Sequence, residues 1–283
     1  MARRVILFAA LLSVGSVNAD DQFRSPSFLA GCDWNPKTTR RVALPERIRE
    51  VSGIAGLEDG TVLAHDDEHG VVYRLETSRG GILGVFPIGG APVGDFEGIA
   101  VWGPRVVVTT SDGKLHIMNN LRSGVTNPAR VIETGIGRLC EVEGLAFELG
   151  GETLLLACKV PRARRLRGSV TIFRWSLKDG AMADPAEISI PLKALTAPIK
   201  ARNFRPSSLD RDPVSGHWLL ISSLDQAIAE LSADGQVIQL RKLPPRFHRQ
   251  PEGVTALIDG TLIISDEGTS QIPPRLTLYS CER

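Results

Sequence analysis

The chain has 283 residues, of which 42% are hydrophobic and 23% are charged, and it carries 33 Lys and Arg against 32 Asp and Glu. This composition is typical of a globular protein that buries a large core. The near balance of charge argues against bulk nucleic-acid binding, which needs a concentrated positive field.

The first nineteen residues have the features of an export signal. The basic start MARR precedes an apolar run of thirteen residues at 5–17, and Val17-Asn18-Ala19 supplies small residues for cleavage. Thirteen residues fall short of the roughly 20 that span a bilayer, so we expect a signal peptide at 1–19 rather than a membrane anchor. The mature protein would then be periplasmic or secreted, with no transmembrane segment.

Residues 20–40 are polar, contain Pro26 and Pro36, and show no periodicity, so we expect a lead-in to the folded domain. From residue 41 onward, short apolar runs alternate with turns of the Asp-Gly kind, a pattern typical of β-hairpins. The expected strands in chain order are 41–44, 51–57, 61–65, 71–75, 82–86, 96–102, 106–110, 114–118, 130–133, 143–147, 153–158, 170–176, 187–191, a strand from 207, 218–222, 228–231, 237–240, 253–257, 262–265 and 276–281.

One motif recurs through these strands as EVSGIA, DFEGIA, EVEGLA, RPSSLD and QPEGVT. Its central positions, Gly53, Gly98, Gly144, Ser208 and Gly253, are separated by 45, 46, 64 and 45 residues. A β-rich period of this length is typical of a β-propeller. We therefore predict an all-β fold, a single β-propeller over 41–283 with five four-stranded blades. A degenerate sixth blade at 160–204 is the alternative, and we expect a monomer.

The last repeat is one strand short, and the strand at 41–44 has no partner in its own unit. We expect this strand to complete the last blade, which closes the ring and protects its edges. Four cysteines allow three pairings. Closure favours Cys32 with Cys281, and folding of one hairpin brings Cys140 opposite Cys158; buried free thiols are the alternative for the second pair.

The residue before each repeated glycine should occupy an equivalent position around the channel, which places three carboxylates on one axis. The second strand of each blade ends at the same mouth and adds further acids. The candidate metal ligands are Glu97, Glu143, Glu252, Asp67, Glu68, Asp112, Asp266 and Glu267. Oxygen ligands from differently spaced loops favour calcium. The alternative is that the glutamates bond neighbouring amides and Lys159, and that the loop acids are solvated.

Basic residues close to the same mouth suggest an anionic ligand. The candidate ligand-binding residues are Lys159, Arg162, Arg164, Arg165 and Arg205. An anionic small molecule or a protein partner would suit this rim, although an arginine run is also common in a solvated loop. His65, beside Asp66 at a strand end, is the candidate general base, but it forms no recognisable triad with a serine.

The whole set of motifs resembles the SdiA-regulated family of exported bacterial β-propellers. The similarity is carried by EVSGIAGLEDGTVLAHDDEHGVVYRLE, DFEGIAV, EVEGLAF with LLLACK, RPSSLDRDPVSGHWLLISSLDQAIAEL and QPEGVTALIDGTLIISDEG, in that order. The resemblance implies channel positions for Glu97, Glu143 and Glu252 and mouth positions for Asp67, Glu68, Asp266 and Glu267. The chain departs from the family pattern at Ser208 and in the arginine loop of the third repeat.

Two functions follow from these observations. The first is a propeller that binds a ligand or partner at a charged mouth together with a calcium-type cation. The second is a metal-dependent hydrolase of phosphate esters, esters or lactones, suggested by a more distant resemblance to phytase-like esterase and calcium-dependent lactonase propellers.

Overall fold

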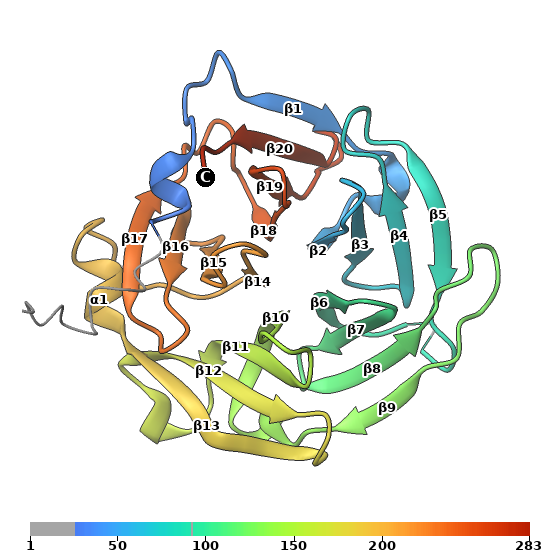
Figure 1. Cartoon of the computed structure of the whole chain (residues 1–283), viewed down its shortest axis with the longest axis horizontal. Helices are drawn as coiled ribbons and strands as arrows, with labels where there is room; N and C mark the ends of the chain where they lie inside the picture. Colours follow the sequence, from blue (N-terminus) through green and yellow to red (C-terminus); the bar gives the residue numbers. More distant parts are fainter. Residues whose placement is uncertain (1–25, 92) are drawn as a thin grey trace, which may run out of the picture.

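The computed structural model describes residues 26–91 and 93–283, so the expected signal peptide lies outside the described residues. Five four-stranded antiparallel sheets are arranged around a central axis, as Figure 1 shows, and the chain is a five-bladed β-propeller. Among the described residues, 160–204 contribute to the third blade and form no sixth sheet. The predicted fold is confirmed.

Each blade is a meander that runs outward from the axis. The first blade contains β2 (Val51–Gly56), β3 (Val62–Asp66), β4 (Val71–Leu75) and β5 (Ile82–Pro87), and the second contains β6 (Phe96–Trp102), β7 (Arg105–Thr110), β8 (Lys114–Asn119) and β9 (Arg130–Glu133). The third blade contains β10 (Cys140–Phe147), β11 (Thr153–Pro161), β12 (Ser169–Ser176) and β13 (Ala181–Pro191). The fourth contains β14 (Ser208–Arg211), β15 (Trp218–Ser222), β16 (Ala227–Leu231) and β17 (Val237–Lys242).

The fifth blade joins the two ends of the chain. It contains β18 (Pro251–Ala256), β19 (Thr261–Asp266) and β20 (Arg275–Ser280), and β1 (Arg40–Ala43) pairs antiparallel with β20 as its outermost strand. The predicted closure by an N-terminal strand is therefore confirmed. The short helices are η2 (Leu29–Gly31), η3 (Glu46–Ile48), η4 (Ile136–Arg138), η5 (Arg164–Leu166) and α1 (Leu192–Thr196), and none of those in the described residues has the length and apolar character needed to cross a membrane.

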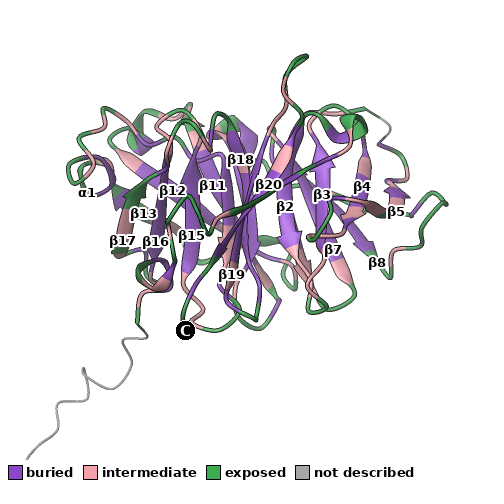
Figure 2. Cartoon of the chain, turned by 90° about the horizontal axis from the view of Figure 1, so that it is seen from above, coloured by how far each residue is buried: buried purple, intermediate pink, exposed green. Residues whose placement is uncertain are grey.

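The hydrophobic core is divided among the five interfaces between neighbouring blades. Five clusters of buried side chains each draw residues from two adjacent sheets, and the buried strands occupy the middle of the molecule in Figure 2. The interface between the fourth and fifth blades also buries Phe28 and Leu29 of the lead-in. Packing between blades, which buries apolar area from water, is thus the main stabilising contribution.

The repeated glycine marks the point where innermost strands of neighbouring blades meet. A Cβ atom built on Gly98 would lie 2.9 Å from Cβ of Leu145, and one on Gly144 would lie 2.8 Å from Cβ of Leu209. In each case the contacted residue directly follows the repeated position of the next blade. The motif recurs because a side chain at this position would push adjacent blades apart.

The fourth repeat has serine at this position and uses it differently. Ser208 accepts a hydrogen bond at Oγ from the backbone N–H of Val254, 3.2 Å away, which is the corresponding residue of the fifth blade. The fifth blade then contacts the first through Gly253, whose Cβ would lie 3.0 Å from Ile54. The series of contacts therefore passes around the whole ring.

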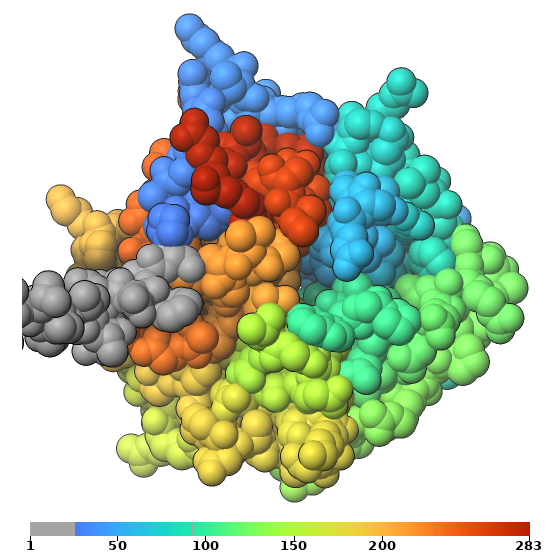
Figure 3. All heavy atoms as spheres, in the orientation of Figure 1, coloured from blue at the N-terminus to red at the C-terminus, as the bar shows by residue number. Residues whose placement is uncertain are grey.

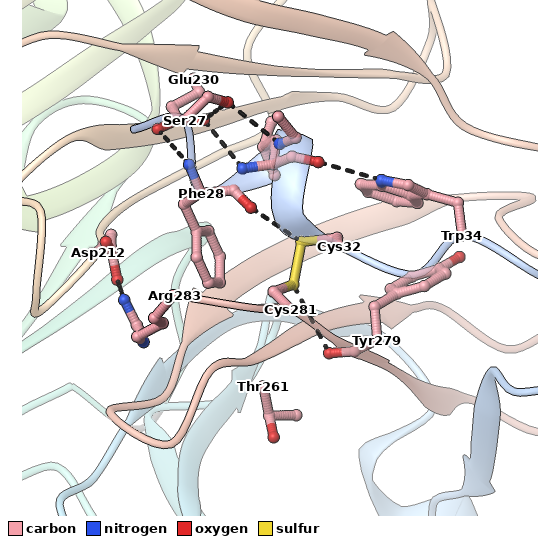
Figure 4. The surroundings of a disulfide bond; sticks show 12 residues. Ser27, Phe28, Cys32, Trp34, Asp212, Glu230, Thr261, Tyr279, Cys281 and Arg283 are labelled. Carbon is pink, nitrogen blue, oxygen red and sulfur yellow. Dashed lines mark hydrogen bonds and ion pairs between the residues drawn. A yellow bond between two sulfur atoms is a disulfide. The ribbon is translucent and has the colours of Figure 1, made fainter. Parts of the chain in front are cut away.

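The lead-in is attached to the fourth blade through a buried carboxylate, shown in Figure 4. Glu230 has no exposed surface, and it accepts hydrogen bonds from Ser27 Oγ at 2.6 Å and from the backbone N–H groups of Phe28 and Leu29 at 2.9 and 3.0 Å. His217 Nδ1 lies 2.7 Å from the same carboxylate. The lead-in thus spans the fourth and fifth blades.

Two disulfides join Cys32 to Cys281 and Cys140 to Cys158, as predicted. The first encloses nearly the whole ring, because its cysteines are 249 residues apart, whereas those of the second are 18 apart. Backbone bonds from Asp33 to Ser280 and from Glu282 to Gly31 flank the first disulfide. It therefore reinforces the same closure that β1 and β20 make.

We predict that Gly98→Ala lowers the free energy of unfolding by about 1–3 kcal/mol, because the new methyl group meets both Cβ and the backbone of Leu145. Gly81→Ala is the control, since its Cβ would have only the Glu76 carboxylate within contact, at 3.6 Å. Denaturant unfolding of both variants measures the difference. Equal stability of the two variants would contradict this role of the repeated glycine.

We also predict that the two disulfides contribute unequally. Because the entropy of loop closure grows with loop length, replacing Cys32 and Cys281 by serine should cost about 2 kcal/mol more than replacing Cys140 and Cys158. Denaturant unfolding of the two double variants provides the comparison. An equal or larger loss of stability in the Cys140 and Cys158 variant would contradict this prediction.

Candidate functional site

A β-bulge at the start of the innermost strand directs the candidate carboxylates. In four blades the strand register shifts across the residue before the repeated glycine, and this residue is Ser52, Glu97, Glu143 or Glu252. A bulged residue has no directly paired partner, and its side chain is turned away from the regular pleat. The same irregularity therefore presents four equivalent side chains at one end of the central channel.

Lys159 lies among these carboxylates. Its ammonium group contacts the carboxylate of Glu143, which is only 2% exposed. Burial lowers the pKa of Lys159, but the charges of Glu143, Glu97 and Glu252 outweigh this effect and raise it overall. The lysine thus remains charged and partly compensates the three glutamates.

The glutamates still take up protons more readily than solvated carboxylates. Burial and the charge of Glu143 raise the pKa of Glu97 to about 10, and burial raises that of Glu143 to about 7 against the opposing effect of Lys159. Burial also raises the pKa of Glu252, which hydrogen bonds from Ser223 and Ser207 partly offset. Burial and mutual repulsion therefore favour the protonated form of these glutamates, and Lys159 opposes this most directly at Glu143.

A second acidic group lies where the first and fifth blades meet. Burial, followed by the charges of Glu252, Asp67 and Glu50, raises the pKa of Glu267 to about 8. Burial and the charge of Glu50 raise the pKa of Asp67 to about 6. The backbone joins the two blades here through a 2.8 Å bond from Gly268 to the carbonyl of Arg49. We call Glu50, Asp67 and Glu267 the seam acids.

One buried oxygen of the seam acids accepts no hydrogen bond from the described residues. Oδ1 of Asp67 is buried and has no hydrogen-bond partner among the described residues. A buried carboxylate oxygen without a partner is costly and is the kind of atom that a cation or an ordered water satisfies. In the described part of the chain, however, no three His, Cys, Asp or Glu side chains are already arranged as a metal centre. The donors suit calcium chemically, but side chains would have to rotate to coordinate it.

The remaining candidate metal ligands have local partners. Asp266 is 3% exposed and accepts from His248 Nδ1 at 2.8 Å, and His248 Nε2 lies 2.6 Å from the hydroxyl of Tyr279. Asp112 pairs with Lys114 at 2.9 Å at a turn of its own blade. Glu68 is exposed. Asp266 nevertheless acts on Glu252, and Glu68 acts on Asp67, so both lie near the carboxylates that act on Glu267.

His65 is enclosed between blades. It has no exposed surface, its Nδ1 lies 2.9 Å from the carbonyl of Asp66, and a Cβ on Gly53 would lie 2.5 Å from its Nε2. Burial lowers the pKa of this imidazole. In this position His65 does not reach solvent at the mouth.

The predicted arginine rim is divided among separate contacts. Arg165 makes two hydrogen bonds of 2.6 Å to Glu187 on the outermost strand of its blade, and Arg162 donates to the carbonyl of Gly137. Arg164 lies in η5, and the backbone N–H of Arg205 donates to Ser222 Oγ at 3.2 Å. Lys159 is thus the candidate basic residue that acts directly on the central glutamates.

Glu50 was not among the predicted site residues. It opens the first motif, EVSGIA, where Asp95 and Glu141 open the second and third. That recurrence of an acid could have pointed to Glu50. The seam between first and last blades, however, is known only once the order of the ring is fixed.

Comparisons with known proteins agree with this architecture. A glutaminyl cyclase from Myxococcus xanthus is 13% identical, with 86% of this chain and 96% of that chain covered and a TM-score of 0.57. A putative oxidoreductase (glucose dehydrogenase) from Thermus thermophilus is 15% identical, with 85% and 99% covered and a TM-score of 0.55. At such identities these structures show the fold alone.

No curated protein matches the sequence. Residues 39–269, which include all five repeats, match the family described as SdiA-regulated. This range contains the central glutamates, Lys159 and the seam acids. The chain therefore belongs to the SdiA-regulated family.

Proposed function

We propose that the protein is an exported propeller that binds a cation at its acidic mouth, and through it a small ligand or partner. The observation that carries this proposal is the buried oxygen of Asp67, which has no hydrogen-bond partner among the described residues and belongs to the acids that act on Glu267. The two disulfides support export, because such bonds persist in oxidising compartments.

The distribution of charge favours the seam acids as the binding position. Lys159 is in contact with Glu143 and also acts on Glu97. Asp67 and Glu267 have no such contact with a basic side chain among the described residues. The charges of neighbouring acids help to raise the pKa of each. A cation placed between them would remove this repulsion and satisfy the unpartnered oxygen of Asp67.

Calcium is the cation to test first. The seam acids offer only oxygen donors, which hard cations prefer, and they come from different elements whose side chains can adjust to a variable coordination number. An organic ammonium group would also pair with these carboxylates. Neither membership of the family nor the fold shared with the two enzymes favours calcium over an organic ammonium group.

The hydrolase alternative has less support from the arrangement of side chains. Its candidate base, His65, has no exposed surface, and its Nε2 lies against Gly53 of the innermost strand. A general base must reach the proton it abstracts, directly or through one water. Binding at the mouth requires only the carboxylates already gathered there.

The cation proposal predicts that calcium binds the parent protein saturably and raises its melting temperature relative to chelator. The double change Asp67→Asn and Glu267→Gln should weaken calcium binding at least tenfold, because it removes both carboxylates that would ionise and coordinate the cation. Isothermal titration calorimetry with calcium chloride measures the effect. Glu152→Gln, an exposed carboxylate elsewhere, is the control. Equal affinity of the double variant and the control, or no binding by the parent, would reject the proposal.

The raised pKa of Glu267 predicts a pH dependence of stability. Between its ordinary value of 4.5 and about 8, the unfolded chain has lost this proton while the folded protein retains it. The free energy of unfolding contributed by this group therefore falls as pH rises through that window and levels off above it. In chelator, Glu267→Gln should flatten the decline and be more stable than the parent at pH 9. Denaturant unfolding from pH 4.5 to 9 tests this, and an unchanged slope would contradict it.

A further inference from the structure

The opposite end of the central channel contains a pocket that the function above does not use. It has a volume of about 860 Å³, within the range of small-molecule sites. The last residues of the five innermost strands and the turns after them line it, whereas the acidic mouth lies at the first residues of these strands. The C-terminal residues, dark red in Figure 3, lie on this face, where Arg283 bonds the carbonyl of Leu257.

Large apolar side chains form much of the wall and rim. Trp102, Phe147 and Leu257 line the pocket. On the turns beside it, Leu149, Val214 and Ile258 are 80%, 57% and 63% exposed. Apolar side chains gathered in this way around a concave surface are typical of a site that binds an apolar body.

Arg211 is the basic residue of the lining, which also contains the acids Glu58, Asp59 and Asp210. Asp59 is paired with Arg74. The guanidinium carbon of Arg211 lies 5.4 Å from the centre of the Trp102 ring, so the cation is held against an aromatic face. Nε of Arg211 is buried and has no hydrogen-bond partner among the described residues. A buried N–H donor without an acceptor is costly, so a ligand oxygen that reached this guanidinium group would satisfy it.

Asp210, the neighbour of Arg211, does not fill that role. Its carboxylate is engaged with Thr255 and the backbone of Arg211, and burial nevertheless raises its pKa to about 6. Asp210 instead adds an acceptor on the pocket wall, where a hydroxyl or amino group of a ligand could donate.

We propose that this pocket binds an aromatic carboxylate, with the ring against Trp102 and Phe147 and the carboxylate on Arg211. A carboxylate matches the planar fork of donors on a guanidinium group, and a flat ring matches the aromatic wall. This site is independent of the acidic mouth, because the two lie at opposite ends of the channel.

The test is calorimetric titration of the full chain with benzoate, 2-naphthoate and indole-3-acetate. We expect at least one of these acids to bind saturably in the submillimolar range, and the uncharged 2-naphthamide to bind at least tenfold more weakly than 2-naphthoate. Arg211→Met, which keeps the aliphatic stem, should weaken binding of the acid at least tenfold. Arg246→Met is the matched control, because Arg246 also lies over an aromatic ring, Phe247, at 4.8 Å but outside the pocket.

A second variant guards against a folding defect in Arg211→Met. Ile258→Glu adds a negative charge on an exposed turn at the rim and should weaken binding of the acid without lowering the melting temperature. Glu143→Gln, at the acidic mouth, should leave it unchanged. Absence of binding by all three acids, or equal affinity of the parent and both pocket variants, would overturn the proposal.

Discussion

The close approach of the five innermost strands is the constraint on which the structure depends. At the repeated position of three blades, the next blade comes so near that glycine fits best, and the serine of the fourth blade is accommodated by a hydrogen bond to the neighbouring backbone. Packing at this distance fixes the angle between blades. The strand β1, the lead-in and the disulfide between Cys32 and Cys281 then hold the two ends of the chain together at the fifth blade.

The same short motif also produces the site. The residue before the glycine lies in a β-bulge, and so the geometry that lets blades approach also turns Ser52, Glu97, Glu143 or Glu252 toward the axis. Burial is the main cause of the raised pKa values of the three glutamates, and the like charges so placed add to it. Lys159 compensates part of the charge of the central glutamates. Asp67 and Glu267, by contrast, have no contact with a basic side chain among the described residues.

Much of the fold could be predicted from the sequence, because the period, the turn residues and the missing strand all depend on local patterns. Most predicted strand limits lie within a few residues of the observed ones, although β13 extends from Ala181 rather than residue 187. The burial of His65, the ion pair of Arg165 with Glu187 and the contribution of Glu50 could not be predicted in this way. Each depends on which side chains of different blades meet, and that distance is not encoded in any single repeat.

The central claim is that the carboxylates gathered as the seam acids form a cation site, which releases their protons when a cation binds. The most direct measurement is an anomalous difference map from crystals of the parent protein grown with calcium. The account predicts a peak at coordination distance from the carboxylates of Asp67 and Glu267 that disappears in the Asp67→Asn and Glu267→Gln double variant. A map of the parent without a peak near either carboxylate would contradict it.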